Sequence, residues 1–193
     1  MYEVELKVRA DHEAVRERLA DRGAEPTEAV TQVDTYYDAP HRAFAETDEA
    51  LRIREESRSD GETVAELTYK GPLVEAESKT RREVQTELGD GEAGGAILEA
   101  LGFEPAATVR KERERFGVGE YTVTLDRVEG LGEFVEVETE TDEGGVEPAR
   151  ERAVELLREL DLDPDEQIRT SYLGLLLAAD DSESDRDRPG ESV

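Results

Sequence analysis

The chain has 193 residues, enough for one domain or two small ones with a sizeable core. Its 51 acidic residues outnumber its 24 basic residues, and the resulting charge of −27 disfavours binding along a nucleic-acid backbone. Cysteine is absent, which excludes disulfides, thiolate zinc sites and cysteine nucleophiles.

An acidic chain with only four lysines is typical of proteins adapted to high salt, and it favours a source resembling a halophilic archaeon. No apolar signal region opens the chain, and its longest apolar run, Leu175 to Ala179, is too short to span a bilayer. We therefore expect a cytoplasmic protein that does not enter a membrane.

Residues Tyr2 to Arg9 alternate between apolar and charged side chains, the pattern of a strand with two different faces. Asp11 then opens a stretch with apolar residues at helical spacing, and Gly23 is a natural end for that helix. Further strands, separated by turn sequences, are predicted at Gln32 to Asp38, Ala50 to Glu56, Thr63 to Lys70, Thr80 to Leu88, Thr108 to Phe116, Glu120 to Arg127 and Glu133 to Thr141. Further helices are predicted at about Glu92 to Leu101, Pro148 to Leu160 and Glu166 to Ala178.

These elements amount to eight strands in meander order with the helices outside them. The arrangement predicts an α+β fold, built on an antiparallel sheet that closes into a β-barrel with flanking helices. Residues 1–179 form the predicted domain. Residues 180–193 have no apolar side chain to bury before the last position, so we expect a disordered acidic tail there.

Cations occur on strand faces where a salt-adapted surface would carry Glu and Asp. Arg52 and Arg54 share one side of a strand, and Lys111 and Arg113 share one side of another. The ordinary explanation is a solvated sheet face with cross-strand ion pairs. The placement of scarce cations favours instead a site for a polyanion such as a triphosphate.

Carboxylates are paired on the first and last predicted strands, as Glu3 and Glu5 and as Glu136 and Glu138. If these strands are neighbours in a closed barrel, the four groups converge, and such oxygen ligands suit Mg²⁺ or Mn²⁺. Lys7 lies on the same face as Glu5 and is placed to offset their mutual repulsion.

A glycine-rich phosphate loop is not the source of phosphate binding. The glycine cluster at residues 91–95 lacks the Gly-Lys-Ser/Thr sequence that such a loop requires. Cationic side chains must therefore hold any bound phosphates.

The segment Glu3-Val-Glu-Leu-Lys7 resembles the ExExK signature of the CYTH, or triphosphate tunnel metalloenzyme, superfamily. This superfamily includes class IV adenylate cyclases, thiamine triphosphatases and inorganic triphosphatases. The resemblance runs from Tyr2 to about Leu177 and looks closest to the class IV adenylate cyclases. It is also carried by Asp34-Thr-Tyr-Tyr-Asp38, Asp48-Glu-Ala-Leu-Arg-Ile-Arg54, Tyr69-Lys-Gly-Pro72, Arg110-Lys-Glu-Arg113 and the segment from Leu125 through Glu138.

The resemblance implies an eight-stranded tunnel and a role for each matching residue. The implied metal ligands are Glu3, Glu5, Asp126, Glu136 and Glu138. The implied phosphate-binding set is Lys7, Arg52, Arg54, Lys70, Lys111 and Arg113, with Glu83 as a further tunnel carboxylate among them. The catalytic residues expected from the same comparison are Lys7, Lys111 and Asp126.

Three functions remain open at this stage. The first is a class IV-like adenylate cyclase that converts ATP to cyclic AMP and pyrophosphate with Mg²⁺ or Mn²⁺. The second is a metal-dependent hydrolase of tripolyphosphate, thiamine triphosphate or a nucleoside triphosphate, and the third is a non-catalytic binder of nucleotide or polyphosphate.

Proteins similar to this one form dimers, so a homodimer is expected. Tyr172 is expected to be a helix core residue, and Arg115 is left open between phosphate binding and ion pairing.

Overall fold

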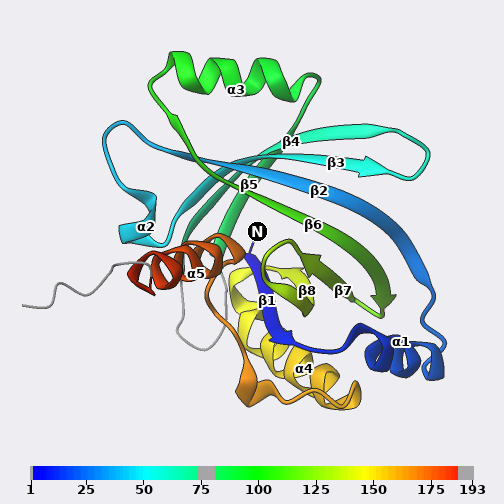
Figure 1. Ribbon diagram of the computed structural model, residues 1–193. Helices are drawn as coiled ribbons and strands as arrows, with labels where there is room; N and C mark the ends of the chain where they lie inside the picture. The colour runs from blue at the N-terminus through cyan, green and yellow to red at the C-terminus, as the bar shows by residue number, and fades with distance from the viewer. Residues whose placement is uncertain (1, 74–80, 187–193) are drawn as a thin grey trace, which may run out of the picture.

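The computed structural model describes residues 2–73 and 81–186, in which the strands close into an antiparallel barrel (Figure 1). The strands are β1 Tyr2–Arg9, β2 Pro26–Asp38, β3 Ala50–Arg58, β4 Thr63–Leu73, β5 Arg81–Leu88, β6 Glu104–Val118, β7 Tyr121–Val128 and β8 Gly132–Thr141. The helices are α1 His12–Asp21, α2 Phe44–Thr47, α3 Gly91–Ala100, α4 Val146–Glu159 and α5 Tyr172–Arg186, with 3-10 turns η1 Glu143–Gly145 and η2 Pro164–Glu166.

The barrel order is β1-β5-β4-β3-β2-β6-β7-β8, and every neighbouring pair is antiparallel. The predicted eight-stranded closed antiparallel barrel with flanking helices is therefore confirmed. Strands β2 and β6 begin earlier than predicted, because their first residues lack the alternation that marks a strand in sequence. Thr80, the predicted first residue of the fifth strand, lies outside the described residues.

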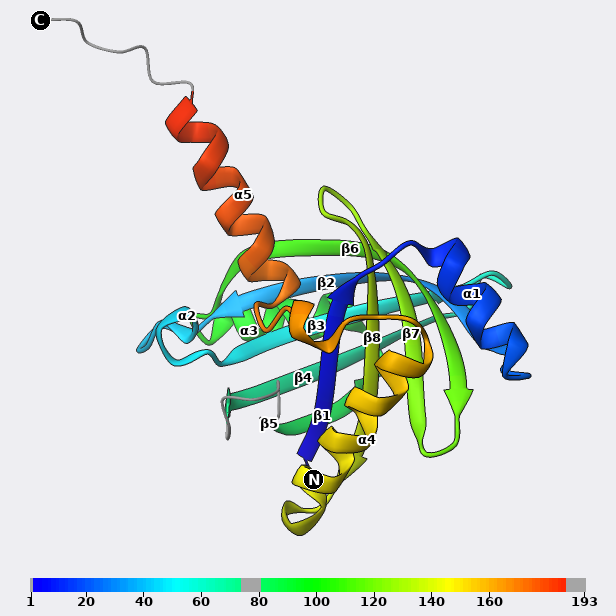
Figure 2. The same cartoon turned by 90° about the horizontal axis from the view of Figure 1, so that it is seen from below.

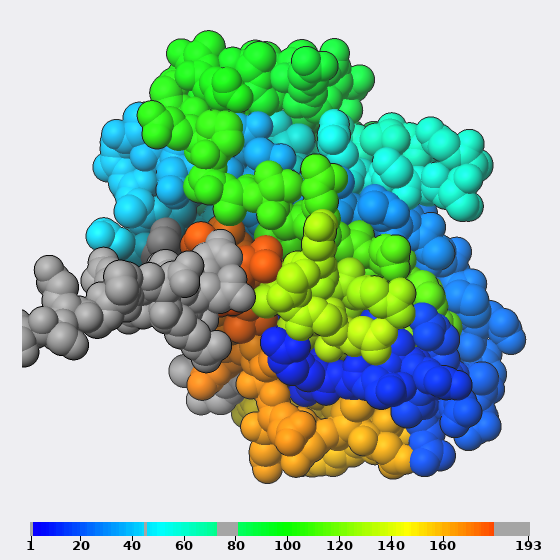
Figure 3. Space-filling model, viewed as in Figure 1, coloured from blue at the N-terminus to red at the C-terminus, as the bar shows by residue number. Residues whose placement is uncertain are grey.

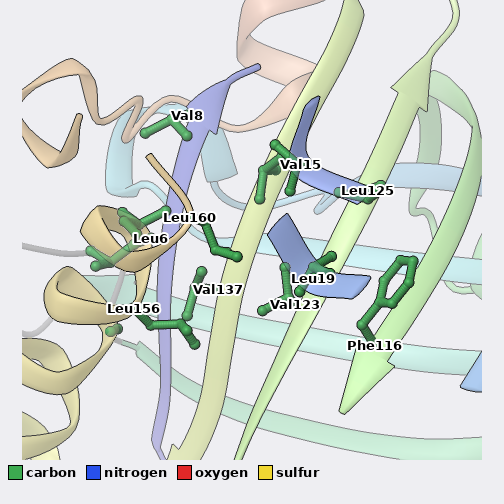
Figure 4. Close-up of a cluster of buried hydrophobic side chains, with 13 residues drawn as sticks. Leu6, Val8, Val15, Leu19, Phe116, Val123, Leu125, Val137, Leu156 and Leu160 are labelled. Atoms are coloured by element: carbon green, nitrogen blue, oxygen red, sulfur yellow. The ribbon is translucent and has the colours of Figure 1, made fainter. Parts of the chain in front are cut away.

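The apolar faces of the strands point away from the barrel axis and pack under helices. Leu6, Val123 and Val137 from β1, β7 and β8 join Leu19 of α1 and Leu156 of α4 in one buried cluster (Figure 4). In the view from below, α4 lies along β1 and β8 (Figure 2), and α3 covers the opposite side of the barrel (Figure 3). Because side chains alternate along each strand, packing the apolar face outward directs the charged face inward.

Helix α5 begins at Tyr172, later than the predicted start at Glu166. The preceding residues are held by β1, since the backbone N–H of Ile168 donates to the carbonyl oxygen of Lys7 at 2.7 Å. Ser171 then caps the helix, because its hydroxyl oxygen accepts from the backbone N–H of Gly174 at 3.0 Å. These hydrogen bonds thus keep residues 167–171 out of the helix.

Helix α5 also runs further than predicted, because residues 180–186 continue it where a disordered tail was expected. Extending an existing helix by one residue costs less free energy than starting a new one, so an apolar first half supports a polar continuation. Residues 187–193 of the predicted tail lie outside the described residues. Among the helices that the structure describes, none is long and apolar enough to cross a membrane.

Candidate active site

The inside of the barrel is a charged cavity of about 1880 Å³. Eight strands line it with their inward faces, and the predicted site residues meet there from six of them. All of those residues except Asp126 line the cavity: Glu3, Glu5, Lys7, Arg52, Arg54, Lys70, Glu83, Lys111, Arg113, Glu136 and Glu138.

The pairing of β1 with β8 brings the two carboxylate pairs together, as the sequence predicted for neighbouring first and last strands. Glu5 lies opposite Glu138, and Lys7 lies opposite Glu136. Residues directly opposite each other in an antiparallel pair have Cβ atoms only about 5 Å apart. The register therefore places an ammonium group and three carboxylates on one patch of the cavity wall.

Asp126 lies on the inward face of β7, opposite Arg113, with none of its surface exposed. It accepts hydrogen bonds from Lys111 Nζ at 3.0 Å and from Arg113 Nε at 2.6 Å, and Tyr172 donates its hydroxyl proton to Asp126 Oδ2 at 3.0 Å. Burial opposes ionisation of Asp126, but the charges of Arg113 and Lys111 outweigh it and lower the pKa of the carboxyl group. Asp126 thus anchors two cations, and its role as a metal ligand stays a prediction from the family resemblance.

Asp34 plays the same part for the cations of β3. Arg54 donates to it through Nε at 2.6 Å and Nη2 at 2.7 Å, and Arg52 Nη1 lies 3.3 Å from Asp34 Oδ2. Burial would raise the pKa of Asp34, but the two guanidinium charges hold it well below its usual range. In the sequence, Asp34 stands out only as part of a motif. Its role as an anchor is not visible there, because the two arginines that it binds lie on another strand.

Lys70 of β4 bridges the carboxylates of two neighbouring strands. Its Nζ lies 3.2 Å from Glu3 Oε1 and also forms an ion pair with Glu83. Burial lowers the pKa of Lys70, but the negative charge of Glu3 and then that of Glu83 outweigh burial, so the net pKa is raised. Lys70 therefore stays charged in the cavity.

The pKa values of Lys111 and Glu138 are both shifted toward neutral pH. Burial, with the added repulsion of Arg113, lowers the pKa of Lys111 to about 8. Burial raises the pKa of Glu138 to about 7, and the charges of Glu3, Glu136 and Glu5 add to this. Burial is the largest cause for both groups, so a bound ion of opposite charge would stabilise the charged form of each.

Three cavity residues were not assigned a role from sequence. Tyr172 was expected only in a helix core, but its side chain also lines the cavity. The sequence could not show this, because the path of the chain before α5 brings Tyr172 to the cavity. Arg115 continues the alternation of β6 and forms ion pairs with Glu28 at 2.6 Å and Glu56 at 2.7 Å, as the other cavity arginines do with their own carboxylates. Arg81 donates through Nη1 to the carbonyl oxygen of Asp48 at 2.9 Å.

The carboxylates at the β1 and β8 end fit a divalent cation by their chemistry. Over residues 2–73 and 81–186, no three acidic or histidine side chains approach closely enough to form a complete metal cage. Mg²⁺ does not require one, since it is usually bound by one or two carboxylates with waters and substrate phosphates. Glu138, whose pKa is raised by burial and then by the charges of nearby carboxylates, and its neighbours Glu3, Glu5 and Glu136 are the residues that would hold it.

Comparison with known proteins matches residues 1–172 to the CYTH domain. The chain belongs to the CYTH family. Members of the CYTH family are typically enzymes, and the triphosphate tunnel enzymes within it depend on metal ions. The resemblance read from the ExExK segment and its companion motifs is thus confirmed.

Three similar proteins cover most of this CYTH chain. The "Putative adenylate cyclase" of Methanocaldococcus jannaschii is 39% identical over 177 residues, which are 91% of this chain and 98% of that protein. "Adenylate cyclase CyaB" of Aeromonas hydrophila is 29% identical over 149 residues, 76% of this chain and 73% of that protein. The solved structure of the PH1819 protein from Pyrococcus horikoshii OT3 matches with a TM-score of 0.85 and 39% identity, covering 92% of this chain and 99% of that one.

Proposed function

We propose that this CYTH protein is a metal-dependent adenylate cyclase of the class IV type, which converts ATP to 3′,5′-cyclic AMP and pyrophosphate. The observation that carries the proposal is one cavity whose wall holds cations from β1, β3, β4 and β6 beside carboxylates shared by β1 and β8. A triphosphate needs the first, and the metal ions that accompany it need the second. The names of two relatives as adenylate cyclases support this reaction.

The cations would bind the triphosphate as a group. Arg52 and Arg54 are fixed by Asp34, while Lys111 and Arg113 are fixed by Asp126, so their remaining N–H groups are oriented before substrate arrives. Lys7 and Lys70 complete the phosphate-binding set from β1 and β4. A cavity with preorganised donors loses little free energy on ordering when it binds phosphate oxygens.

In the cyclase reaction, the ribose 3′ oxygen bonds to the α-phosphorus while the bond from that phosphorus to the β-phosphate oxygen breaks. The proton of the 3′ hydroxyl passes to a carboxylate of the cavity that is not holding the metal ion. Lys7 and Lys111 stabilise the negative charge that develops on the departing pyrophosphate. A bound divalent ion would lower the pKa of the hydroxyl and neutralise phosphate charge.

Apolar side chains in the cavity wall favour a nucleotide over a bare triphosphate as the ligand. Tyr36, Phe44, Leu51 and Leu173 line the same cavity. Aromatic and aliphatic side chains of this kind can pack against a purine, whereas inorganic tripolyphosphate has no apolar part to bury. Hydrolysis of a triphosphate by water in the same site is the second candidate, and a non-catalytic binder of nucleotide or polyphosphate is the third.

The test is to incubate the purified protein with ATP and Mg²⁺ or Mn²⁺ at high KCl and to separate the products. Cyclic AMP and pyrophosphate in equal amounts are expected. Orthophosphate without cyclic AMP would show that the protein is a hydrolase and not a cyclase. Tight binding of ATP without any turnover would show that it is a non-catalytic binder.

A further inference from the structure

Tyr172, the first residue of α5, closes one part of the cavity wall with an unusual set of neighbours. Its side chain is only 7% exposed, and its ring meets Phe134 of β8 edge-on, with the centroids 5.0 Å apart. Part of its surroundings is apolar, since it shares a buried cluster with Val109 of β6 and Val128 of β7. It also contacts two ammonium groups and a carboxylate, which packing in an apolar core would not require.

The ammonium groups of two cavity lysines, Lys7 and Lys111, lie over the Tyr172 ring. Lys7 Nζ is 4.2 Å from the ring centroid, and Lys111 Nζ is 5.0 Å from it. These distances are within the range in which an aromatic face attracts a cation, and the attraction is stronger where water is excluded, as it is around these buried lysines. One ring therefore contacts two like charges that reach it from β1 and β6.

The hydroxyl group of Tyr172 connects the same residues through Asp126. It donates to Asp126 Oδ2, the oxygen that also accepts from Lys111 Nζ at 3.0 Å. The chain just before the ring holds Lys7 as well, since Lys7 Nζ donates to the carbonyl oxygen of Thr170 at 2.7 Å. Each lysine is thus restrained at its ammonium group by the start of α5 and by a second partner.

We propose that Tyr172 is a positioning residue, which holds the ammonium groups of Lys7 and Lys111 at the separation that a bound triphosphate requires. A lysine stem has four rotatable carbons, and two buried ammonium groups repel each other, so without a shared contact their positions would spread. The ring and the hydroxyl group restrain both of them at once. The inference rests on triphosphate binding in this cavity but not on cyclisation.

The variants Tyr172→Leu and Tyr172→Phe separate the two contacts. Leucine removes the ring and the hydroxyl group, whereas phenylalanine keeps the ring over both lysines and removes only the hydrogen bond to Asp126. Tyr69→Phe is a matched control, because Tyr69 also donates a hydroxyl proton to a carboxylate, that of Glu49, and does not line the cavity.

Two measurements report on position rather than on fold. In protein with ¹³C-labelled lysine side chains, the ε-methylene signals of Lys7 and Lys111 should be shifted by the aromatic ring, and Tyr172→Leu should remove that shift while the Lys70 signal stays. The Kd for inorganic tripolyphosphate in EDTA should rise by about tenfold in Tyr172→Leu and by about threefold in Tyr172→Phe. Tyr69→Phe should leave both measurements unchanged.

An unchanged Kd in folded Tyr172→Leu would overturn the proposal, even if the melting temperature fell, because a purely structural role predicts that combination. If Tyr172→Leu does not fold, Tyr172→Phe decides, and a wild-type Kd in it would overturn the proposal equally. If the wild type forms no cyclic AMP but its tripolyphosphate binding depends on Tyr172, the cyclase proposal fails and this inference stands. If the wild type forms cyclic AMP but its tripolyphosphate binding does not depend on Tyr172, the cyclase proposal stands and this inference fails.

Discussion

Arg113 binds Asp126 through two parallel hydrogen bonds, from Nε to Oδ1 at 2.6 Å and from Nη2 to Oδ2 at 2.5 Å. The same guanidinium group also donates to Glu136, which lines the cavity. A single arginine thus joins a fully buried carboxylate to one that lines the cavity. This bidentate geometry fixes the orientation of the arginine plane, which a single charge contact would not do.

Replacing Asp126 by alanine should lower the free energy of unfolding by about 3–5 kcal/mol. The change leaves Lys111 and Arg113 buried with less compensation and removes the acceptor of the Tyr172 hydroxyl group. Urea unfolding at fixed KCl measures the effect. Glu112→Ala is the control, because its ion pair with Arg127 is mostly solvent-exposed and should cost less than about 1 kcal/mol. Equal costs for the two variants would contradict a buried anchor.

Tripolyphosphate affinity should fall as the pH rises from about 7 to about 9. Lys111 has a pKa of about 8, so its ammonium form, which binds the anion, is lost over this interval. Since the bound anion favours that form, binding above pH 8 should take up a proton. Calorimetry in buffers of different ionisation enthalpy measures the uptake. Lys111→Arg should flatten the pH dependence, because arginine stays charged.

Lys70→Arg is the control for this titration. The pKa of Lys70 is raised, so it stays charged over the same interval and its replacement should leave the pH dependence in place. A flat affinity profile in the wild type, or proton release on binding, would show that Lys111 does not titrate in the site.

Glu138→Gln should raise the concentration of Mg²⁺ or Mn²⁺ needed for half-maximal activity, and Glu136→Ala should abolish the metal-dependent activity. Glutamine keeps the size of Glu138 but removes a negative charge from the acidic patch that β1 and β8 share. Metal titrations of the initial rate with ATP measure both changes. Glu112→Ala, on an exposed ion pair, should titrate as the wild type. Near wild-type rates in Glu136→Ala would mean that the patch holds no metal.

Adding KCl should raise the melting temperature of the protein. The formal charge is −27, and repulsion among exposed carboxylates opposes folding unless salt screens it. The screening length falls from about 10 Å at 0.1 M to about 3 Å at 1 M salt, which is shorter than most separations between surface charges. Thermal unfolding in a KCl series measures the effect, and a melting temperature that falls with KCl would contradict salt adaptation.

The sequence alone identified the strands and most of the site, because both follow from alternation. In β6, for example, Lys111 and Arg113 share a face whatever the strand pairs with, and the same holds for Glu136 and Glu138 in β8. Residues held in place by distant partners were not recognised in this way. The last helix was predicted to start at Glu166 rather than at Tyr172, because the hydrogen bond from Ile168 to Lys7 leaves no local trace in the sequence.

Which charged groups line the cavity and which are fully buried against them was decided only by the tertiary structure. Asp126 and Glu136 are both acidic strand residues, yet closure of the barrel buries the first against Lys111 and Arg113 and leaves the second on the wall. Tyr172 reaches Asp126 across 46 residues of sequence. Alternation determines the two faces of a strand. Burial and pairing between strands then determine the protonation, orientation and role of each charge on them.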